Sequence, residues 1–226
     1  MKINLLNFFS MKALKIIGAI LFIIGITFKF VHWPFASIIF IVGTLLMFVH
    51  GLIFLFQKMK QNSTNAWVTF TFSLFAIYIL FRFQYWPAGP RIIGFPLLFI
   101  MVFGFSVFSL FKIFQSKFQS KIQSFFFLIA FSFFMILSYV HSYSIFYLVN
   151  LNSVTNGSTR ELNYHAWDRY SWFLYIADRK GDAIDANVQA KKAAKFVANN
   201  YGEYEAALYL KEIKKHGILI EKGTWK

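Results

Sequence analysis

Five long apolar runs fill the first part of the chain, and residues 1–159 contain no aspartate or glutamate. A helix needs roughly 17–25 mostly apolar residues to cross a bilayer. We therefore expect five membrane-spanning helices, at about residues 13–31, 36–57, 66–83, 92–114 and 122–146. The predicted fold class is all-α: a polytopic membrane protein made of two repeated hairpins plus one helix, followed by a small helical C-terminal soluble tail.

The positive charge is a membrane-topology signal rather than a nucleic-acid surface. The chain has 23 Lys and Arg against 9 Asp and Glu, and eleven of those cations precede residue 160, beside the apolar runs. Cytoplasmic loops of membrane proteins are enriched in Lys and Arg. A cytoplasmic N-terminus leaves only Lys29, Arg82 and Arg91 on the opposite side. We predict a bacterial inner-membrane protein with a periplasmic tail and no nucleic-acid partner.

Two short segments, Phe28–Pro34 and Phe81–Pro87, repeat one pattern: aromatic, cation, aromatic, two residues, Trp, Pro. Proline disfavours helix immediately before it, so each segment predicts the turn of a membrane hairpin. The expected domains are residues 1–57 (first hairpin), 58–115 (second hairpin), 116–149 (fifth helix) and 150–226 (linker and tail). The predicted corner and partner-binding residues are Lys29, His32, Trp33, Pro34, Arg82, Tyr85, Trp86 and Pro87.

The two corner cations have two readings. Lys29 and Arg82 could extend toward the lipid headgroups, with the neighbouring Trp and Tyr residues forming an interfacial belt. Alternatively they face the helix bundle and meet an anionic ligand or a partner's carboxylate, because intramembrane charges usually have partners. Since no predicted span contains an acid, that counter-charge would come from the tail, a lipid phosphate or another protein.

Two histidines, His50 and His141, are the predicted intramembrane polar residues. Their expected depths differ, which favours hydrogen-bonded histidines over a shared haem. The polar run 138–144 is either the end of a helix or the lining of a cavity. His165 and Asp168 stand one helical turn apart, which alone is a weak metal signal. We predict no catalytic residue, no metal and no cofactor, because the motifs that carry such chemistry are missing from the sequence.

The tail predicts three helices, at about 162–179, 183–199 and 203–216, with an extended end from Ile218 to Lys226. Asp182 is the expected N-cap of the second helix. A stripe of small residues at helical spacing predicts its buried face: Ala186, Ala190, Ala193 and Val197. The expected interaction face of the tail consists of Trp167, Tyr170 and Phe173.

The first hairpin contains a pattern of glycines, Phe-Lys and His-Trp-Pro: Ile17-Gly18-Ala19-Ile20, Ile24-Gly25, Phe28-Lys29-Phe30-Val31-His32-Trp33-Pro34-Phe35-Ala36 and Gly43. This pattern resembles the N-terminal two-span region of GldL-type proteins of Bacteroidetes, over residues 16–57 and more weakly over 69–114. The resemblance implies an inner-membrane component of the gliding and type 9 secretion machinery, working with a single-span periplasmic partner as a proton-driven motor. This chain lacks the motor's intramembrane glutamate, so we carry over the hairpin fold, the phylum and a link to gliding or type 9 secretion, and leave out the motor role.

The function predicted from these features is a non-enzymatic inner-membrane scaffold or accessory subunit that binds membrane lipids and other membrane or periplasmic proteins. One alternative is a small-molecule or ion transporter, with a cavity lined by Lys29, Arg82, His50 and the polar run. A second alternative is a membrane redox subunit.

Overall fold

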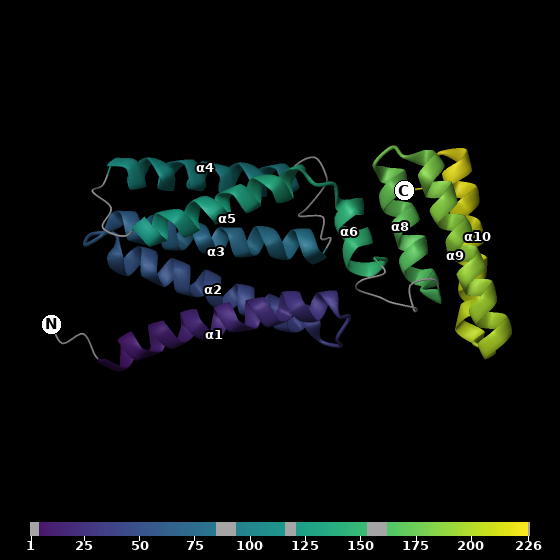
Figure 1. The fold of residues 1–226 in the computed structure, drawn as a ribbon, viewed down its shortest axis with the longest axis horizontal. Helices are drawn as coiled ribbons and strands as arrows, with labels where there is room; N and C mark the ends of the chain where they lie inside the picture. Colours follow the sequence, from purple (N-terminus) through teal and green to yellow (C-terminus); the bar gives the residue numbers. More distant parts are fainter. Residues whose placement is uncertain (1–4, 85–93, 116–120, 153–161, 226) are drawn as a thin grey trace. The chain divides into compact units, whose positions relative to one another are not determined.

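The computed structural model describes residues 5–84, 94–115, 121–152 and 162–225, and these residues form helices and turns without a strand (Figure 1). Contacts divide the chain into two compact units, Met1–Lys29 with Trp33–Val140 and Phe30–His32 with His141–Lys226. The helices are α1 (Leu5–Phe30), α2 (Ala36–Lys58), α3 (Ser63–Gln84), α4 (Gly94–Gln115), α5 (Lys121–Tyr139), α6 (Ser142–Asn150), α8 (Tyr164–Ile176), α9 (Lys180–Tyr201) and α10 (Tyr204–Lys222).

Four of these helices are long and apolar enough to cross a membrane, and a fifth candidate is a broken pair. The all-helical class and the apolar helices are thus confirmed. The fifth predicted helix, over 122–146, is interrupted: α5 ends at Tyr139 and a separate helix, α6, begins at Ser142. The number of candidate spans is therefore four, or five if this broken pair is one span. The four unbroken candidates are Met11–Phe30, Ala36–Lys58, Ser63–Gln84 and Leu97–Gln115.

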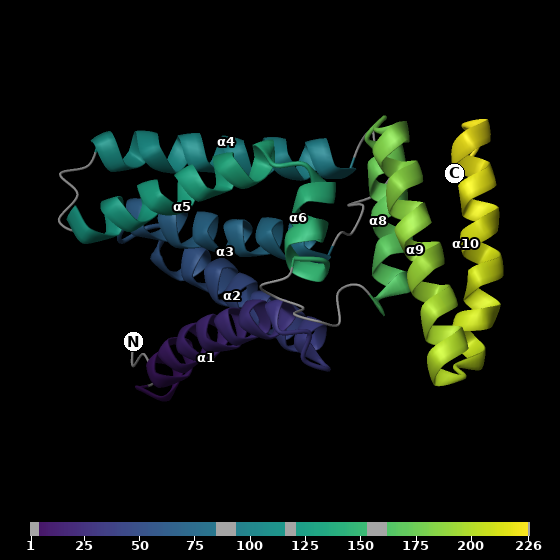
Figure 2. The ribbon, with the colours of Figure 1, turned by 45° about the vertical axis from the view of Figure 1, so that its right-hand side comes forward.

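Helix α3 is the centre of the first unit and contacts α2, α4 and α5 (Figures 1 and 2). It is the least apolar of the four candidate spans and the most buried. Its polar side chains bond inside the bundle: Thr71 Oγ1 lies 2.8 Å from Ser109 Oγ of α4, and Tyr78 Oη donates to Ser138 Oγ of α5 at 2.8 Å. Hydrogen bonding between helices explains why a less apolar sequence occupies the central position.

Glycines bring α1 and α2 into backbone contact. A Cβ atom on Gly25 would lie 2.5 Å from Phe40 Cα, and one on Gly43 would lie 2.4 Å from Phe22 N. Small residues allow this approach. In a lipid environment the hydrophobic effect contributes little to helix association, and close van der Waals packing of this kind takes its place. Gly51 is equally close to Ser73 of α3, whereas Gly104, its counterpart in the sequence repeat, has nothing within 4 Å. The repeat therefore does not produce equivalent packing.

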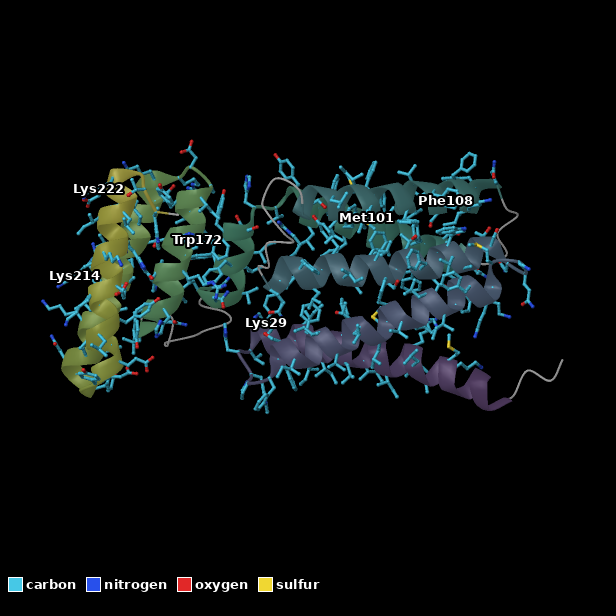
Figure 3. All side chains as sticks on the ribbon, turned by 180° about the vertical axis from the view of Figure 1, so that it is seen from behind. Lys29, Met101, Phe108, Trp172, Lys214 and Lys222 are labelled. Atoms are coloured by element: carbon cyan, nitrogen blue, oxygen red, sulfur yellow. The ribbon has the colours of Figure 1, made fainter. Side chains whose placement is uncertain are left out.

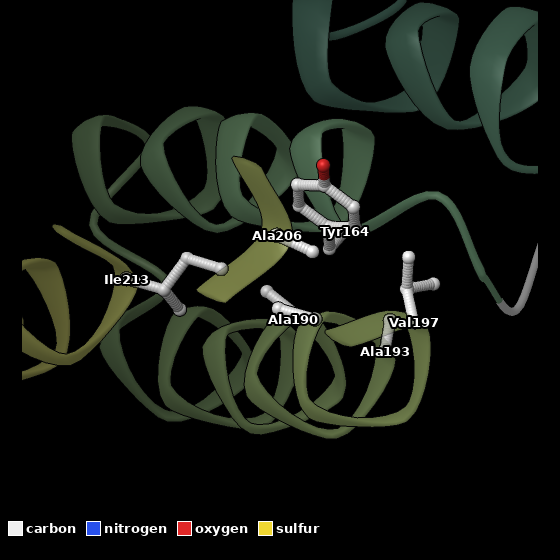
Figure 4. Packing of buried hydrophobic residues seen from close by; sticks show 7 residues of the cluster. Tyr164, Ala190, Ala193, Val197, Ala206 and Ile213 are labelled. Atoms are coloured by element: carbon white, nitrogen blue, oxygen red, sulfur yellow. The ribbon is translucent and has the colours of Figure 1, made fainter. Parts of the chain in front are cut away.

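The tail helices α8, α9 and α10 pack through small residues (Figure 4). The predicted stripe of α9 is confirmed as buried. Its core partners on the other two helices include Tyr164 of α8 and Ala206 and Ile213 of α10. Alanine side chains allow close helix approach, so a small unit obtains a dense core from little apolar volume.

Three local details of the tail differ from the sequence-based expectation. Helix α10 continues to Lys222 and ends at Gly223 with φ 71°, so the extended end is wrong. Helix α9 begins at Lys180, which places Asp182 in its first turn rather than at the N-cap. There Asp182 pairs with Arg179 at 2.7 Å, while Asp178 takes the positive φ of 62° that precedes the helix.

Helix α6 belongs to the same compact unit as the tail. The Phe146 ring lies 5.0 Å from that of Phe173, and the Tyr147 ring lies 5.4 Å from that of Tyr170. Such pairs contribute beyond the area they bury. The tail core thus begins at α6, directly after the break that follows α5.

The glycine contacts give a direct test. Gly25→Ala forces backbone atoms of α1 and α2 apart, and overpacking of this kind costs about 1–3 kcal/mol. We expect a lower thermal unfolding midpoint of the detergent-solubilised chain, measured by circular dichroism. Gly104→Ala is the matched control, because open space surrounds that position and alanine is the better helix former. Equal loss of stability in the two variants would contradict the packing described.

Candidate functional site

The candidate site begins at the corner between α1 and α2. Trp33 N donates to Phe28 O at 2.9 Å, and the Trp33 ring stacks on that of Phe28 at 4.9 Å. Phe35 adopts φ 68° and His32 adopts φ 54°, which are uncommon for residues with a Cβ atom. The corner nevertheless leaves Trp33 56% and Phe35 70% exposed, with Pro34 exposed between them. A strained turn that displays two aromatic rings is a candidate for recognition.

Lys29 joins three helices behind this corner. Its Nζ donates to Ser37 Oγ of α2 and to Gln84 Oε1 of α3, each at 3.3 Å, and Ser37 Oγ donates to the same Gln84 oxygen at 3.1 Å. Figure 3 shows the Lys29 side chain beside the turn end of α1. The network connects the end of α1, the start of α2 and the end of α3.

Arg82 binds the end of α5. Its side chain is 7% exposed, and its guanidinium donates to Leu137 O at 2.9 Å and to Val140 O. The last carbonyls of a helix lack intrahelical donors and carry partial negative charge, so a cation there is favourable. One turn earlier on α3, Tyr78 donates to Ser138, whose hydroxyl donates to Phe134 O at 2.7 Å. These bonds connect the end of α5, which lies in the polar run, to α3.

Both corner cations therefore turn toward neighbouring helices. Because residues 1–159 contain no acid, the acceptors within this unit are neutral amide, hydroxyl and carbonyl oxygens. The role of Lys29, His32, Trp33, Pro34 and Arg82 in partner binding stays a prediction. The remaining corner residues of the second copy, Tyr85, Trp86 and Pro87, lie outside the described residues.

The two histidines have different surroundings. His50 is 7% exposed and its ring lies 5.7 Å from that of Phe54. His141 is exposed, serves as the N-cap residue of α6 and belongs to the other compact unit. Its ring stacks on Tyr143 at 5.2 Å. Within the described residues, no group of three or more His, Cys, Asp or Glu side chains could hold a metal ion.

The tail contains a polar cluster that the sequence reading did not find. Asp168 of α8 is 3% exposed, and its carboxylate lies 2.9 Å from His216 Nδ1. Tyr209 Oη donates to the same carboxylate at 3.2 Å. Burial raises the pKa of the Asp168 carboxyl above its ordinary value, while His216 and Tyr209 act in the opposite direction. The nearby His165 stood out in the sequence, but the partners from α10 carried no local signal.

The residues of the predicted interaction face of the tail pack largely against other residues of their own unit. Phe173 is 5% exposed and packs against Phe146 of α6. Tyr170 contacts the rings of α6. Trp167 packs against two buried clusters of the tail, one that includes Ile213 and one that includes Leu174. Whether these three residues bind a partner stays a prediction.

Comparison with protein-family models, with curated proteins and with solved structures finds no match for this chain.

The Arg82 contact predicts a specific loss of stability. Arg82→Met removes charge-assisted hydrogen bonds, which contribute about 1.5–3 kcal/mol each, and leaves the last carbonyls of α5 without their donor. We expect a clearly lower unfolding midpoint in detergent, partly restored in Arg82→Lys. Lys112→Met is the control, because Lys112 lies over the Phe108 ring at 5.6 Å and can be replaced by apolar contact. Equal midpoints for Arg82→Met and Lys112→Met would contradict the capping role.

Tyr209 predicts a change of tail stability in alkali. Burial, with the neighbouring Asp168 carboxylate, raises the pKa of Tyr209 to about 12. Because this folded-state pKa exceeds the ordinary value of about 10, its contribution to stability is complete below pH 10 and is lost as pH rises through about 12. Circular dichroism melts across this range should show that loss. Tyr209→Phe should remove this component and Tyr204→Phe, at a 76% exposed residue, should keep it.

Proposed function

We propose that this chain is a non-enzymatic scaffold or accessory subunit of the bacterial inner membrane, with a cytoplasmic N-terminus and a periplasmic tail. Its apolar helices bind lipids and partner membrane proteins, and its tail binds a periplasmic partner. The proposed topology rests on the distribution of Lys and Arg along the chain.

The observation that carries the proposal is the corner formed by Trp33 and Phe35. Both rings are more than half exposed, and both sit on a backbone held by the Phe28 stack and the Lys29 network. Exposed aromatic side chains on a rigid support lose little conformational entropy on binding, and such residues dominate binding energy at interfaces. The corner is therefore suited to seat a partner at the edge of the membrane.

The resemblance of residues 16–57 to GldL-type proteins suggests where such a partner belongs. We propose the gliding or type 9 secretion machinery of Bacteroidetes as the setting. In this chain the hairpin would serve attachment rather than proton-driven motion, because residues 1–159 offer no carboxylate for a proton relay.

The transporter alternative receives less support. Arg82 and Ser138, which would line its cavity, are engaged in holding α5 to α3. A solute would have to compete with these hydrogen bonds. The redox alternative would require ligands for a cofactor; the His50 ring lies 5.7 Å from that of Phe54, and the His141 ring stacks on that of Tyr143.

Photo-crosslinking in native membranes tests the proposal. A photoreactive residue replacing Phe35 should capture one discrete protein, identified by mass spectrometry. The same residue replacing Phe114, which is 80% exposed on α4, should give lipid adducts. Lys29→Met should reduce the Phe35 product several-fold, because it frees the corner from α2 and α3. Lipid adducts alone from position 35 would overturn the proposal.

A further inference from the structure

One face of helix α10 points away from the core of the tail. The buried residues of the helix lie on its other side: Ala206, Ile213, Gly217 and Ile220. Six exposed residues follow one another at alternating intervals of four and three: Tyr204, Leu208, Lys211, Lys215, Ile218 and Lys222. Residues at this spacing form one row along a helix. We call this row the lysine stripe.

The lysine stripe exposes apolar side chains between its charges. Tyr204 is 76% exposed, Ile218 50% and Leu208 45%. Leu208 and Ile218 each lie one helical turn from a lysine of the stripe. Apolar area therefore remains in contact with water on the charged face of the helix, and binding to a second surface would remove it from water.

The acidic residues of α10 lie off the stripe. Glu205, Glu212 and Glu221 stand roughly 80–100° around the helix from its centre line, at 3.6 residues per turn. Lys214 flanks the stripe, and its side chain and that of Lys222 extend from the exposed side of the helix (Figure 3). The centre of this face thus carries positive charge and no negative charge.

An anionic lipid surface fits these properties better than an acidic protein does. The outer face of a single helix is convex, so it can rest on a flat and fluid surface without a matching groove. Lysine places its aliphatic stem against apolar material while its ammonium group reaches the headgroups. Tyrosine is enriched at the membrane–water interface. Lysines clustered on an amphipathic helix bind anionic lipids.

The chain itself brings a lipid surface close to the tail. Four of its helices are long and apolar enough to cross a membrane, and the tail follows them in the same polypeptide. Linking a binding element to its target turns the contact into an intramolecular event with a high effective concentration. A weak contact, too weak to recruit a free protein, is then sufficient.

We propose that the lysine stripe of α10 binds anionic phospholipid headgroups, with Tyr204, Leu208 and Ile218 entering the interface. The contact rests on the membrane location of the chain and does not require the protein partner proposed above. Because the attraction is largely electrostatic, added salt weakens it.

Spin labelling of the full chain in lipid nanodiscs tests this contact. The sequence contains no cysteine, so Ala207→Cys places a single label beside the stripe and leaves its six residues intact. We expect the collision rate of the label with a neutral, water-soluble nickel complex to be several-fold lower in nanodiscs that contain phosphatidylglycerol than in nanodiscs of phosphatidylcholine. About 1 M salt should restore the rate, because charges are then screened beyond about 3 Å.

Matched charge variants of the labelled chain identify the lysines responsible. Lys211→Gln combined with Lys215→Gln should remove most of the protection, since each lysine near an anionic surface strengthens association about fivefold. Lys192→Gln combined with Lys195→Gln removes the same charge from exposed positions of α9 and should keep the protection. A label introduced by Gln189→Cys, at an exposed position of α9, should collide equally in both lipids.

Three outcomes would overturn the proposal. The first is an equal collision rate at position 207 in the two lipids. The second is protection that survives when Lys211 and Lys215 are replaced. The third is protection in native membranes but not in phosphatidylglycerol nanodiscs, because a protein would then cover the stripe.

Discussion

In an apolar layer, the end of a helix must find its hydrogen-bond partners within the protein, since no water is at hand to supply them. The first unit, whose helices are apolar enough to cross a membrane, places its own cations at helix ends. Arg82 donates to the final carbonyls of α5, and Lys29 connects three helix ends through Ser37 and Gln84. Neutral oxygen atoms accept the hydrogen bonds of Lys29 and Arg82. Both cations therefore have partners in a unit that contains no acidic residue. The central position of α3 follows, because it carries Arg82 and Gln84 together.

The tail builds its core differently, with alanines of α9 at the centre of the packing and larger side chains around them. Alanines bring α9 close to its neighbours, and Ile213 of α10 fills the space between them. The remaining side is closed by a buried carboxylate with two donors. Burying Asp168 is favourable only when it is paired. The tail therefore combines apolar packing with a polar contact between α8 and α10.

The apolar helices could be predicted from the sequence because hydropathy is a local property and a bilayer fixes the length of a span. The contacts that position the candidate sites could not be predicted from the sequence. Arg82 donates to carbonyls at the end of α5 that follow it by 55 and 58 positions, and Asp168 finds its partners 41 and 48 positions later. Gly51 and Gly104 occupy matching places in the repeat, yet only Gly51 meets a neighbouring helix. The helix ends in the tail were also hard to predict: Asp178 adopts a φ of 62° before α9, and Asp182, the expected N-cap, lies inside the first turn of that helix.

The contact between Arg82 and α5 also has a consequence for biogenesis. A ribosome makes α3 before it makes residues 137–140, so during synthesis the guanidinium of Arg82 exists before its final acceptors. In the proposed membrane setting, the headgroup region or the insertion machinery accommodates this charge until α5 emerges. The contact between α3 and α5 therefore forms only after both helices have been made. A chain whose synthesis stops between them lacks the carbonyl acceptors of Arg82.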